Sequence, residues 1–234
     1  MTEIALVADL HGNLPAVEAL DRDLKKRGIE KIWCLGDVVG KGPSSADTYD
    51  WALSRCEILL MGNWDSGIAF KEFPKDQFYY DQLGEKRMQG LKEFLPEYEC
   101  MISGRKMRLF HGRPILPAPI QTYHEEELLS PYFLPDFDVV GYADVHRQGM
   151  RVLGHQGLLF NTGSVGNGIG VPMVQYAILR GELGGKEISP LDINLVSLPY
   201  DREKAIRDTL EAEKNGLVNA AAFCREIETG IYSR

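Results

Sequence analysis

The chain has 234 residues, and 26 basic against 34 acidic side chains give it a net charge of −8. Its length suits the core of one α/β domain. Its acidic balance argues against nucleic acid as the main partner, because binding to that backbone depends on clustered Lys and Arg. Four scattered cysteines, with no Cys-x-x-Cys pair, predict free thiols in a reducing compartment. With neither a leader pattern nor an apolar run of spanning length, a cytoplasmic protein without membrane partners is expected.

The first half of the chain alternates strand and helix patterns. Buried strands are predicted at three short apolar runs, residues 4–8, 32–35 and 58–61. A helix is predicted to begin after Asn13, which is a good N-cap, and to end at Gly28. A shorter helix is predicted at about residues 46–53. This βαβαβ order indicates a parallel sheet with right-handed crossovers.

The remainder of the chain is predicted to be β-rich after a helical insertion. Residues 70–95 are polar and helix-prone, and we interpret them as a small helical cap. Further strands are predicted at residues 108–110, 138–140, 149–153, 158–160, 174–179 and 192–198. A tail at about residues 199–234 is predicted to be helical over 201–227. Because no repeat or linker divides the sequence, one domain is expected over residues 1–234.

Side chains able to bind metal follow five of these predicted strands. They are Asp9, His11, Asp37, Asn63, His111, Asp144 and His146. In open α/β sheets, ligands gather beyond the carboxyl ends of the strands, so these side chains are expected to converge. Carboxylate, amide and imidazole ligands without thiolates suit Mn²⁺, Fe²⁺ or Zn²⁺. Seven ligands are sufficient for two ions if one carboxylate bridges, and two close ions can activate a water for attack on phosphorus.

The ordered blocks resemble the calcineurin-like metallophosphoesterases, whose motifs read Asp-x-His, Gly-Asp, Gly-Asn-His-Asp, His-Gly and Gly-His-x-His. They are most similar to small bacterial and archaeal phosphodiesterase-like members. Those proteins carry a Gly-Asp-x-Val-Gly-x-Gly-Pro loop, matched by residues 36–43, and an Asn-Pro-Gly-Ser-Val-Gly loop, matched by residues 161–166. The resemblance covers about residues 4–180. It implies a four-layer α/β/β/α sandwich with a small helical cap.

The resemblance also implies the activity and the ligand set. The expected protein is a phosphodiesterase or phosphatase that uses a hydroxide bridging two divalent metals to hydrolyse a small phosphoester or nucleotide. Asp9, His11 and His146 would hold one ion, and Asn63 and His111 the other. Asp37 would bridge the ions and hold the attacking hydroxide, while Asn63 would also orient a phosphate oxygen. Manganese is the expected metal, with iron, zinc, magnesium and nickel as alternatives.

The last block departs from the family pattern. If Gly141 is matched to the family's glycine, Tyr142 and Asp144 take the two histidine positions. An ungapped match instead places Asp144 and His146 there and replaces the glycine with Ala143. We prefer the second alignment because both of its ligand positions can bind metal. A carboxylate at Asp144 would make the second site harder and more anionic.

Trp64 is the larger departure, because many family members have a histidine at this position that assists the leaving group. Indole cannot transfer that proton, and general acid help is typically about 10²–10⁴-fold. One hypothesis is that Trp64 provides a stacking face for a nucleobase or aryl group. The alternative function, supported by Trp64 and Asp144, is a metal- and nucleotide-binding regulatory protein with little turnover.

Several other residues near the motifs are candidates for substrate contacts. Asn13, Lys41, Trp64 and Arg113 are predicted to bind substrate, although Lys41, Arg113 and the neighbouring Arg147 are equally explained as solvated charges. His124 and His155 fall outside the blocks and are expected to be surface or packing residues. Residues 163–166 are expected to form a tight loop at the floor of the site. The oligomeric state is left open, with a homo-oligomer as one outcome.

Overall fold

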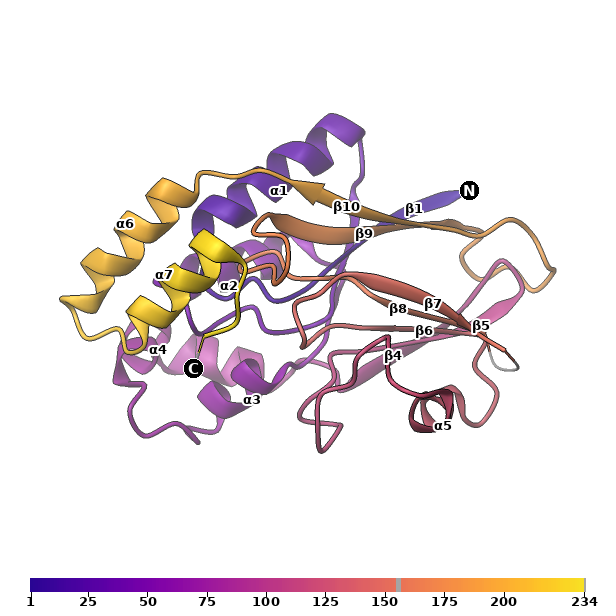
Figure 1. Cartoon of the computed structure of the whole chain (residues 1–234), viewed down its shortest axis with the longest axis horizontal. Coiled ribbons are helices and arrows are strands. Elements are labelled where there is room, and N and C mark those ends of the chain that lie inside the picture. The colour runs from indigo at the N-terminus through magenta and orange to yellow at the C-terminus, as the bar shows by residue number, and fades with distance from the viewer. Residues whose placement is uncertain (155–156, 234) are drawn as a thin grey trace.

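Two five-stranded sheets face each other, with helices on both outer sides (Figure 1). The computed structural model describes residues 1–154 and 157–233. The first sheet has the order β10-β9-β1-β2-β3 and the second the order β4-β5-β6-β8-β7. The strands of the first sheet are β1 (Thr2–Val7), β2 (Lys31–Cys34), β3 (Ile58–Leu59), β9 (Val174–Gly181) and β10 (Asp192–Leu198). Those of the second are β4 (Glu97–Ile102), β5 (Arg105–Phe110), β6 (Val139–Tyr142), β7 (Gly149–Leu153) and β8 (Gly157–Asn161).

The helices surround the sheets from three parts of the chain. Those that follow the first strands are α1 (Leu14–Arg27), α2 (Ser45–Arg55), α3 (Asn63–Ala69) and α4 (Gln77–Leu91). On the far side of the second sheet lie α5 (Glu126–Leu129) and the 3₁₀ helix η1 (Ser130–Phe133). The tail contributes α6 (Arg202–Glu213) and α7 (Ala220–Thr229).

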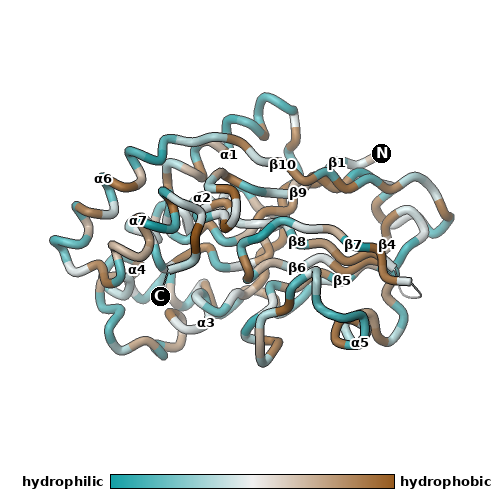
Figure 2. The backbone as a smooth tube through the Cα atoms, in the orientation of Figure 1, coloured by the Kyte–Doolittle hydropathy of each residue, from teal (hydrophilic) through white to brown (hydrophobic). Residues whose placement is uncertain are grey.

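The side chains of β1 show how the layers are built. Successive strand residues point to opposite faces, so Ile4 and Leu6 enter the core between the two sheets while Ala5 and Val7 pack toward the helices. A further apolar cluster lies between the second sheet and α5 with η1. The apolar colouring along the strands in Figure 2 follows this arrangement. The predicted four-layer α/β/β/α sandwich is therefore confirmed.

Most predicted elements of the first half are confirmed, with small shifts in their ends. Strands β1, β2 and β3 pair in parallel in the order the βαβαβ pattern predicts. Helix α1 begins where the Asn13 side chain accepts the backbone N–H of Ala16, and it ends at Gly28, whose φ is 70°. These two residues satisfy helix-end groups that would otherwise lack partners.

Two features differ from the sequence prediction. Strand β4 is not among the predicted strands, and it forms an antiparallel hairpin with β5. The tail forms two helices instead of one, because the chain turns at Gly216, whose φ is 99°. Helix α4 packs on α2 and α3 and buries Tyr79 and Leu83 in the core beside the first sheet. Whether residues 70–95 form a separable cap stays a prediction. Within the described ranges, no helix has the length and apolar character needed to cross a bilayer.

Candidate metal centre

The predicted ligands lie just past the carboxyl ends of strands β1, β2, β5 and β6 and at the start of α3. Five of them have left-handed backbone conformations, with φ between 46° and 71°: Asp9, His11, Asp37, Asp144 and His146. Non-glycine residues seldom adopt such angles, which cost free energy and cluster at functional sites. The fold therefore maintains local strain where these side chains converge.

One group of potential ligands is formed by Asp9, His11 and His146, all buried. The Oδ1 atom of Asp9 lies 3.4 Å from Nε2 of His146 and 3.8 Å from Nε2 of His11. The two imidazole Nε2 atoms are 3.2 Å apart. A carboxylate oxygen and two ring nitrogens thus surround one small volume.

A second group shares Asp9 and adds Asp37 and His111. The Nε2 atom of His111 lies 3.3 Å from Oδ2 of Asp37 and 3.8 Å from Oδ1 of Asp9. The same Oδ2 of Asp37 is 3.6 Å from Nε2 of His11. Asp37 therefore lies between the imidazoles of both groups, where a bridging carboxylate is expected.

The histidine rings are oriented by backbone carbonyl groups. Nδ1 of His111 lies 2.7 Å from the Leu35 carbonyl, and Nδ1 of His11 and of His146 each lie 3.3 Å from a carbonyl, of Val39 and Asn167 respectively. When Nδ1–H of a neutral ring donates to a carbonyl, Nε2 carries the free lone pair and is the nitrogen able to bind metal. Burial lowers the pKa of His11 and His146 well below the usual range, which favours this neutral form.

The centre contains buried polar atoms that the protein itself does not satisfy. Both carboxylate oxygens of Asp9, Oδ1 of Asn63 and Nε2 of His111 have no hydrogen-bond partner among the described residues. Burial raises the pKa of Asp9 well above its usual range, and the charges of Asp37 and Asp144 add to this effect. Burial would lower the pKa of His111, but Asp37 and Asp9 outweigh it and raise that pKa to about 10. Unpartnered oxygen and nitrogen donors beside excess negative charge fit divalent cations.

A buried carboxylate fixes the loop that carries Asp37. The side chain of Asp65 accepts the backbone N–H groups of Asp37 at 2.7 Å, Val38 at 3.0 Å and Gly62 at 3.0 Å. Burial raises the pKa of Asp65 to about 7, against the lowering effect of these N–H groups. Asp37 in turn accepts the N–H of Trp64 through Oδ1 at 2.8 Å, which leaves Oδ2 facing the imidazoles.

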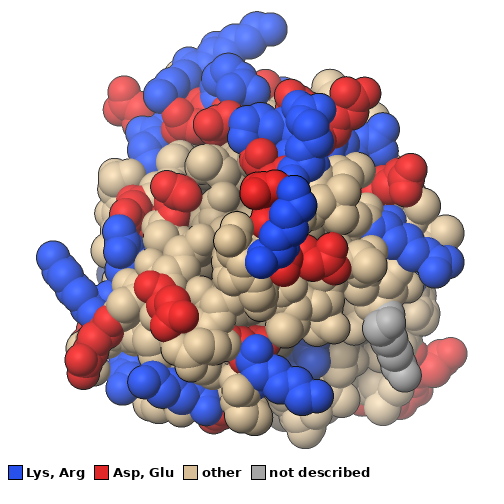
Figure 3. Space-filling view, turned by 90° about the vertical axis from the view of Figure 1, so that its left-hand side faces the viewer, with Lys and Arg blue, Asp and Glu red and all other residues tan. Residues whose placement is uncertain are grey.

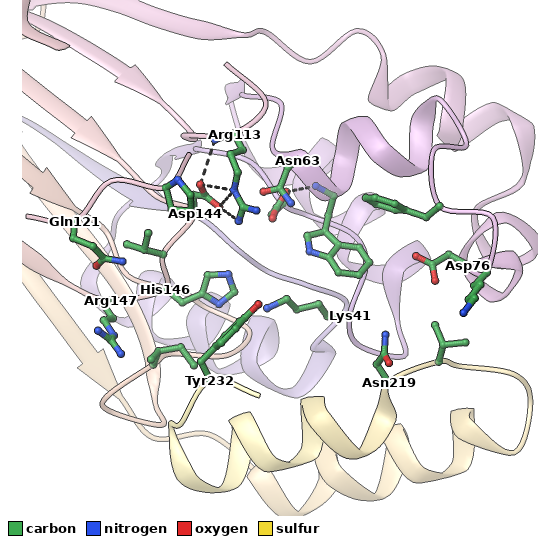
Figure 4. A pocket seen from close by; sticks show the side chains of 18 of the residues that line it. Lys41, Asn63, Asp76, Arg113, Gln121, Asp144, His146, Arg147, Asn219 and Tyr232 are labelled. Carbon is green, nitrogen blue, oxygen red and sulfur yellow. Dashed lines mark hydrogen bonds and ion pairs between the residues drawn. The ribbon is translucent and has the colours of Figure 1, made fainter. Parts of the chain in front are cut away.

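Asp144 belongs to neither group of ligands in the described chain. Its carboxylate is paired with Arg113, whose Nη2 lies 2.5 Å from Oδ1 and whose Nε lies 3.0 Å from Oδ2. The dashed lines of Figure 4 mark this pair at the edge of the cavity. The role of Asp144 as a metal ligand stays a prediction. Tyr142, the alternative from the sequence, lies in the apolar cluster beyond the second sheet.

The centre opens into a cavity of about 1180 Å³. Three of the predicted substrate-binding residues, Lys41, Trp64 and Arg113, line it, as do Asn63 and Arg147. Asn13 is not among the lining residues: its side chain caps α1 and donates to the Gly166 carbonyl at 2.6 Å. Its contacts are thus those of a structural cap, and they give no support to substrate binding.

Some residues of the cavity were absent from the sequence prediction. Asp76 comes from the loop before α4, and Asn219 and Tyr232 come from the tail (Figure 4). They carry no motif, so only the folded arrangement brings them to the site. The loop at residues 163–166 is held to the end of β1, because the N–H groups of Val165 and Gly166 donate to the backbone carbonyls of Ala8 and Asp9. Its place at the floor of the site stays a prediction. His124 lies on the surface side of the second sheet beside Arg151, and His155 lies outside the described residues.

Comparison with known proteins agrees with this architecture. The sequence model of the calcineurin-like phosphoesterase superfamily domain matches residues 2–182. The chain therefore belongs to the calcineurin-like phosphoesterase superfamily. It is 27% identical to the uncharacterized protein MJ0912 of Methanocaldococcus jannaschii, over 86% of this chain and 89% of that protein.

Two crystal structures share the fold over nearly the whole chain. A metallophosphoesterase from Sphaerobacter thermophilus is 20% identical, with a TM-score of 0.75 over 98% of this chain and 99% of that one. The hypothetical protein PH1004 of Pyrococcus horikoshii OT3 is 18% identical, with a TM-score of 0.78 over the full length of both chains. Because the family match ends at residue 182, the similarity of these structures extends the shared fold to the tail.

Proposed function

We propose that the chain is a phosphoesterase that depends on two divalent metal ions, with manganese as the expected metal. Asp9, His11 and His146 would hold one ion and Asn63 and His111 the other, with Asp37 between them. The observation that carries this proposal is the pair of overlapping ligand groups, which share Asp9 and place Asp37 between imidazoles. Two bound ions would supply an activated water and neutralise charge on the phosphoryl oxygens.

The protein's own groups would bind and orient the phosphate. Lys41 and Arg113 enter the cavity from two sides and could each donate to a phosphoryl oxygen. Asn63 adds an amide at the start of α3, and Asp37 is held by the Trp64 N–H in an orientation that faces the imidazoles. Positioning and fixed charge are the main ways in which proteins accelerate phosphoryl transfer.

The cavity supports a small phosphodiester or nucleotide as the substrate. Its volume of about 1180 Å³ suits a ligand of that size, and Trp64 lines it beside Phe73. Acidic and basic side chains are interspersed on the face in Figure 3, without the one-sided basic surface that nucleic acids require. A short phosphoester therefore fits better than a polymer.

Turnover of chromogenic esters tests the proposal directly. Metal-free protein would be assayed with bis(p-nitrophenyl) phosphate and with p-nitrophenyl phosphate after addition of Mn²⁺. We expect Mn²⁺-dependent release of p-nitrophenol, reduced at least about a hundredfold in Asp37→Asn. Binding of two ions without turnover of either ester would contradict the proposal.

That outcome would favour the second candidate, a metal- and nucleotide-binding regulatory protein. Trp64, which replaces the family's usual histidine, and the Arg113–Asp144 pair support it. Equilibrium dialysis with a nucleotide in the presence of Mn²⁺ would then show binding without hydrolysis.

A further inference from the structure

The tail beyond the family match contributes a buried carboxylate beside the metal centre. Glu226 lies on α7, 44 residues after the family match ends at residue 182, and is only 3% exposed. Burying a carboxylate is costly unless other groups satisfy it. The partners of Glu226 therefore indicate why the fold retains a charge at this place.

The contacts of Glu226 lead to two parts of the site. Its Oε2 accepts a hydrogen bond from Nδ2 of Asn167 at 2.6 Å and lies 3.5 Å from Nζ of Lys41. Its Oε1 accepts the N–H of Ser233 at 3.0 Å. One oxygen thus restrains residues of the site, and the other anchors the end of the tail.

Asn167 connects Glu226 to the ligands of one proposed ion. The backbone carbonyl oxygen of Asn167 lies 3.3 Å from Nδ1 of His146, and its backbone N–H donates to Oγ of Ser164 at 3.0 Å. That hydroxyl donates in turn to the backbone carbonyl of Asp9 at 3.0 Å. Groups that fix the far nitrogen of a ligating histidine orient the ring and tune its affinity for metal.

Lys41 is restrained by the tail as well. Its backbone φ of 55° is strained for a residue other than glycine. Its ammonium group lies 5.7 Å from the centre of the Tyr232 ring. Figure 4 shows the ends of Lys41 and Tyr232 directed toward one another in the cavity. Both the carboxylate and the ring that surround this ammonium group therefore come from the last turn of the tail and the residues after it.

We propose that Glu226 is a positioning residue, which orients His146 through Asn167 and holds Lys41 in the cavity. The tail then positions residues of the site in addition to packing against the domain. This inference rests on the proposed function, because it assumes that His146 binds metal and that Lys41 binds phosphate. A purely structural role would affect only the docking of α7.

Glu226→Gln separates the two roles. Gln has one acceptor oxygen, so its NH₂ group must face either the Asn167 amide or the Ser233 N–H, and the ion pair with Lys41 is lost. Glu228→Gln is the matched control, because Glu228 is an exposed residue of the same helix. Calorimetric titration of metal-free protein with Mn²⁺, at a temperature where every variant is folded, gives the affinity of each ion.

We expect Glu226→Gln to weaken one of the two Mn²⁺ affinities about tenfold, the range found for groups that orient metal ligands. Inhibition by inorganic phosphate should weaken in the same variant, and Glu228→Gln should match the parent in both measurements. Asn167→Ala should reproduce the loss of Mn²⁺ affinity. The double variant should add little to it, because the two residues act in series.

Unchanged Mn²⁺ affinity in Glu226→Gln would overturn the inference, even if the melting temperature fell. Full additivity of the Glu226 and Asn167 variants would also overturn it. If the parent itself bound no Mn²⁺, the proposed function would fail and this inference with it. If the parent bound two ions and the variant matched it, only the inference would fail.

Discussion

The guanidinium group of Arg113 lies against both carboxylate oxygens of Asp144, with its Nε 3.1 Å from Oδ1 and 3.0 Å from Oδ2. The Asp144 side chain is 2% exposed, whereas that of Arg113 is 42% exposed. A buried carboxylate is thus neutralised by a cation that reaches it from the cavity. The preferred alignment matches Asp144 to a histidine ligand of the family pattern, so a metal ion would compete with Arg113 for this carboxylate if Asp144 is a ligand as predicted.

Arg113→Gln tests this competition. Without the guanidinium, Asp144 becomes a buried charge without its partner, so metal-free protein should lose about 1–3 kcal/mol of unfolding free energy. This loss of unfolding free energy is smaller than the loss on breaking a fully buried ion pair, because solvent screens the half-exposed Arg113. Mn²⁺ should then stabilise the variant more than the parent, because Asp144 is free to bind it.

Urea denaturation with and without Mn²⁺ measures both effects, and Arg147→Gln is the control at an exposed neighbouring arginine. Equal Mn²⁺ stabilisation of variant and parent would show that Asp144 is no ligand even when released.

Removal of metal should destabilise the whole domain. Asp9, Asn63 and His111 have buried atoms without protein partners, so the folded chain should bind cations that the unfolded chain does not. At a concentration a hundred times its Kd, each ion would contribute about 2.7 kcal/mol. Thermal denaturation after dialysis against a chelator should therefore show a lower Tm, which Mn²⁺ restores. A Tm independent of both treatments would contradict the proposed metal centre.

Replacement of the Asp65 carboxylate by an amide should lower both the stability of the protein and its affinity for Mn²⁺. Its two oxygens accept N–H groups from both sides of the site, those of Asp37 and Val38 on one loop and of Gly62 on the other. In Asp65→Asn, an NH₂ group must face at least one of these donors and leave it unsatisfied. The expected cost is about 1–3 kcal/mol, accompanied by weaker Mn²⁺ binding because Asp37 shifts. Urea denaturation and Mn²⁺ titration of the same variant check both, with Asp208→Asn on the surface of α6 as the control.

Gly40 allows Trp64 to pack against the loop that carries Lys41. A Cβ atom on Gly40 would lie 2.3 Å from Cε3 of the indole, and φ at this position is 86°. Gly40→Ala should therefore combine backbone strain of about 1–2 kcal/mol with an overpacking cost of about 1–3 kcal/mol. Gly184→Ala isolates the strain, because φ is 77° there and nothing lies within 4 Å of the added atom. Equal losses of unfolding free energy in the two variants would show that the contact with Trp64 costs nothing.

The sequence predicts that the Asp and His side chains of the two ligand groups converge because each of them follows a strand whose apolar run is easily recognised. Asp9 and Asp37 lie 28 residues apart, yet parallel pairing of β1 with β2 places both at the same edge of the sheet. The Arg113–Asp144 pair could not be predicted, because nothing in the sequence indicates whether a carboxylate faces a metal or a cation. Glu226 could not be predicted for a different reason: a single acidic residue in the sequence of a polar helix gives no sign that it is buried. Its proposed role depends on the turn near Gly216, after which α7 packs against α6 and Glu226 contacts Asn167.

We expect Trp64 to affect how the leaving group departs in the proposed reaction. The indole cannot donate a proton to the leaving oxygen, so the parent should hydrolyse esters of acidic alcohols far faster than those of ordinary alcohols. Trp64→His would restore the family's usual donor beside Asp37 and the cavity. We expect kcat for a phenyl or alkyl phosphodiester to rise about tenfold or more, because general acid help is typically about 10²–10⁴-fold and the site was not built for it. The rate for bis(p-nitrophenyl) phosphate should change little, since p-nitrophenolate leaves without protonation.

Trp64→Phe is the control, because it removes the indole without adding an acid. This variant should hydrolyse neither ester faster than the parent, and its KM for aryl substrates should rise if the indole face binds them. If Trp64→His accelerates neither class of ester while Mn²⁺ binding is intact, proton donation at this position does not limit the reaction.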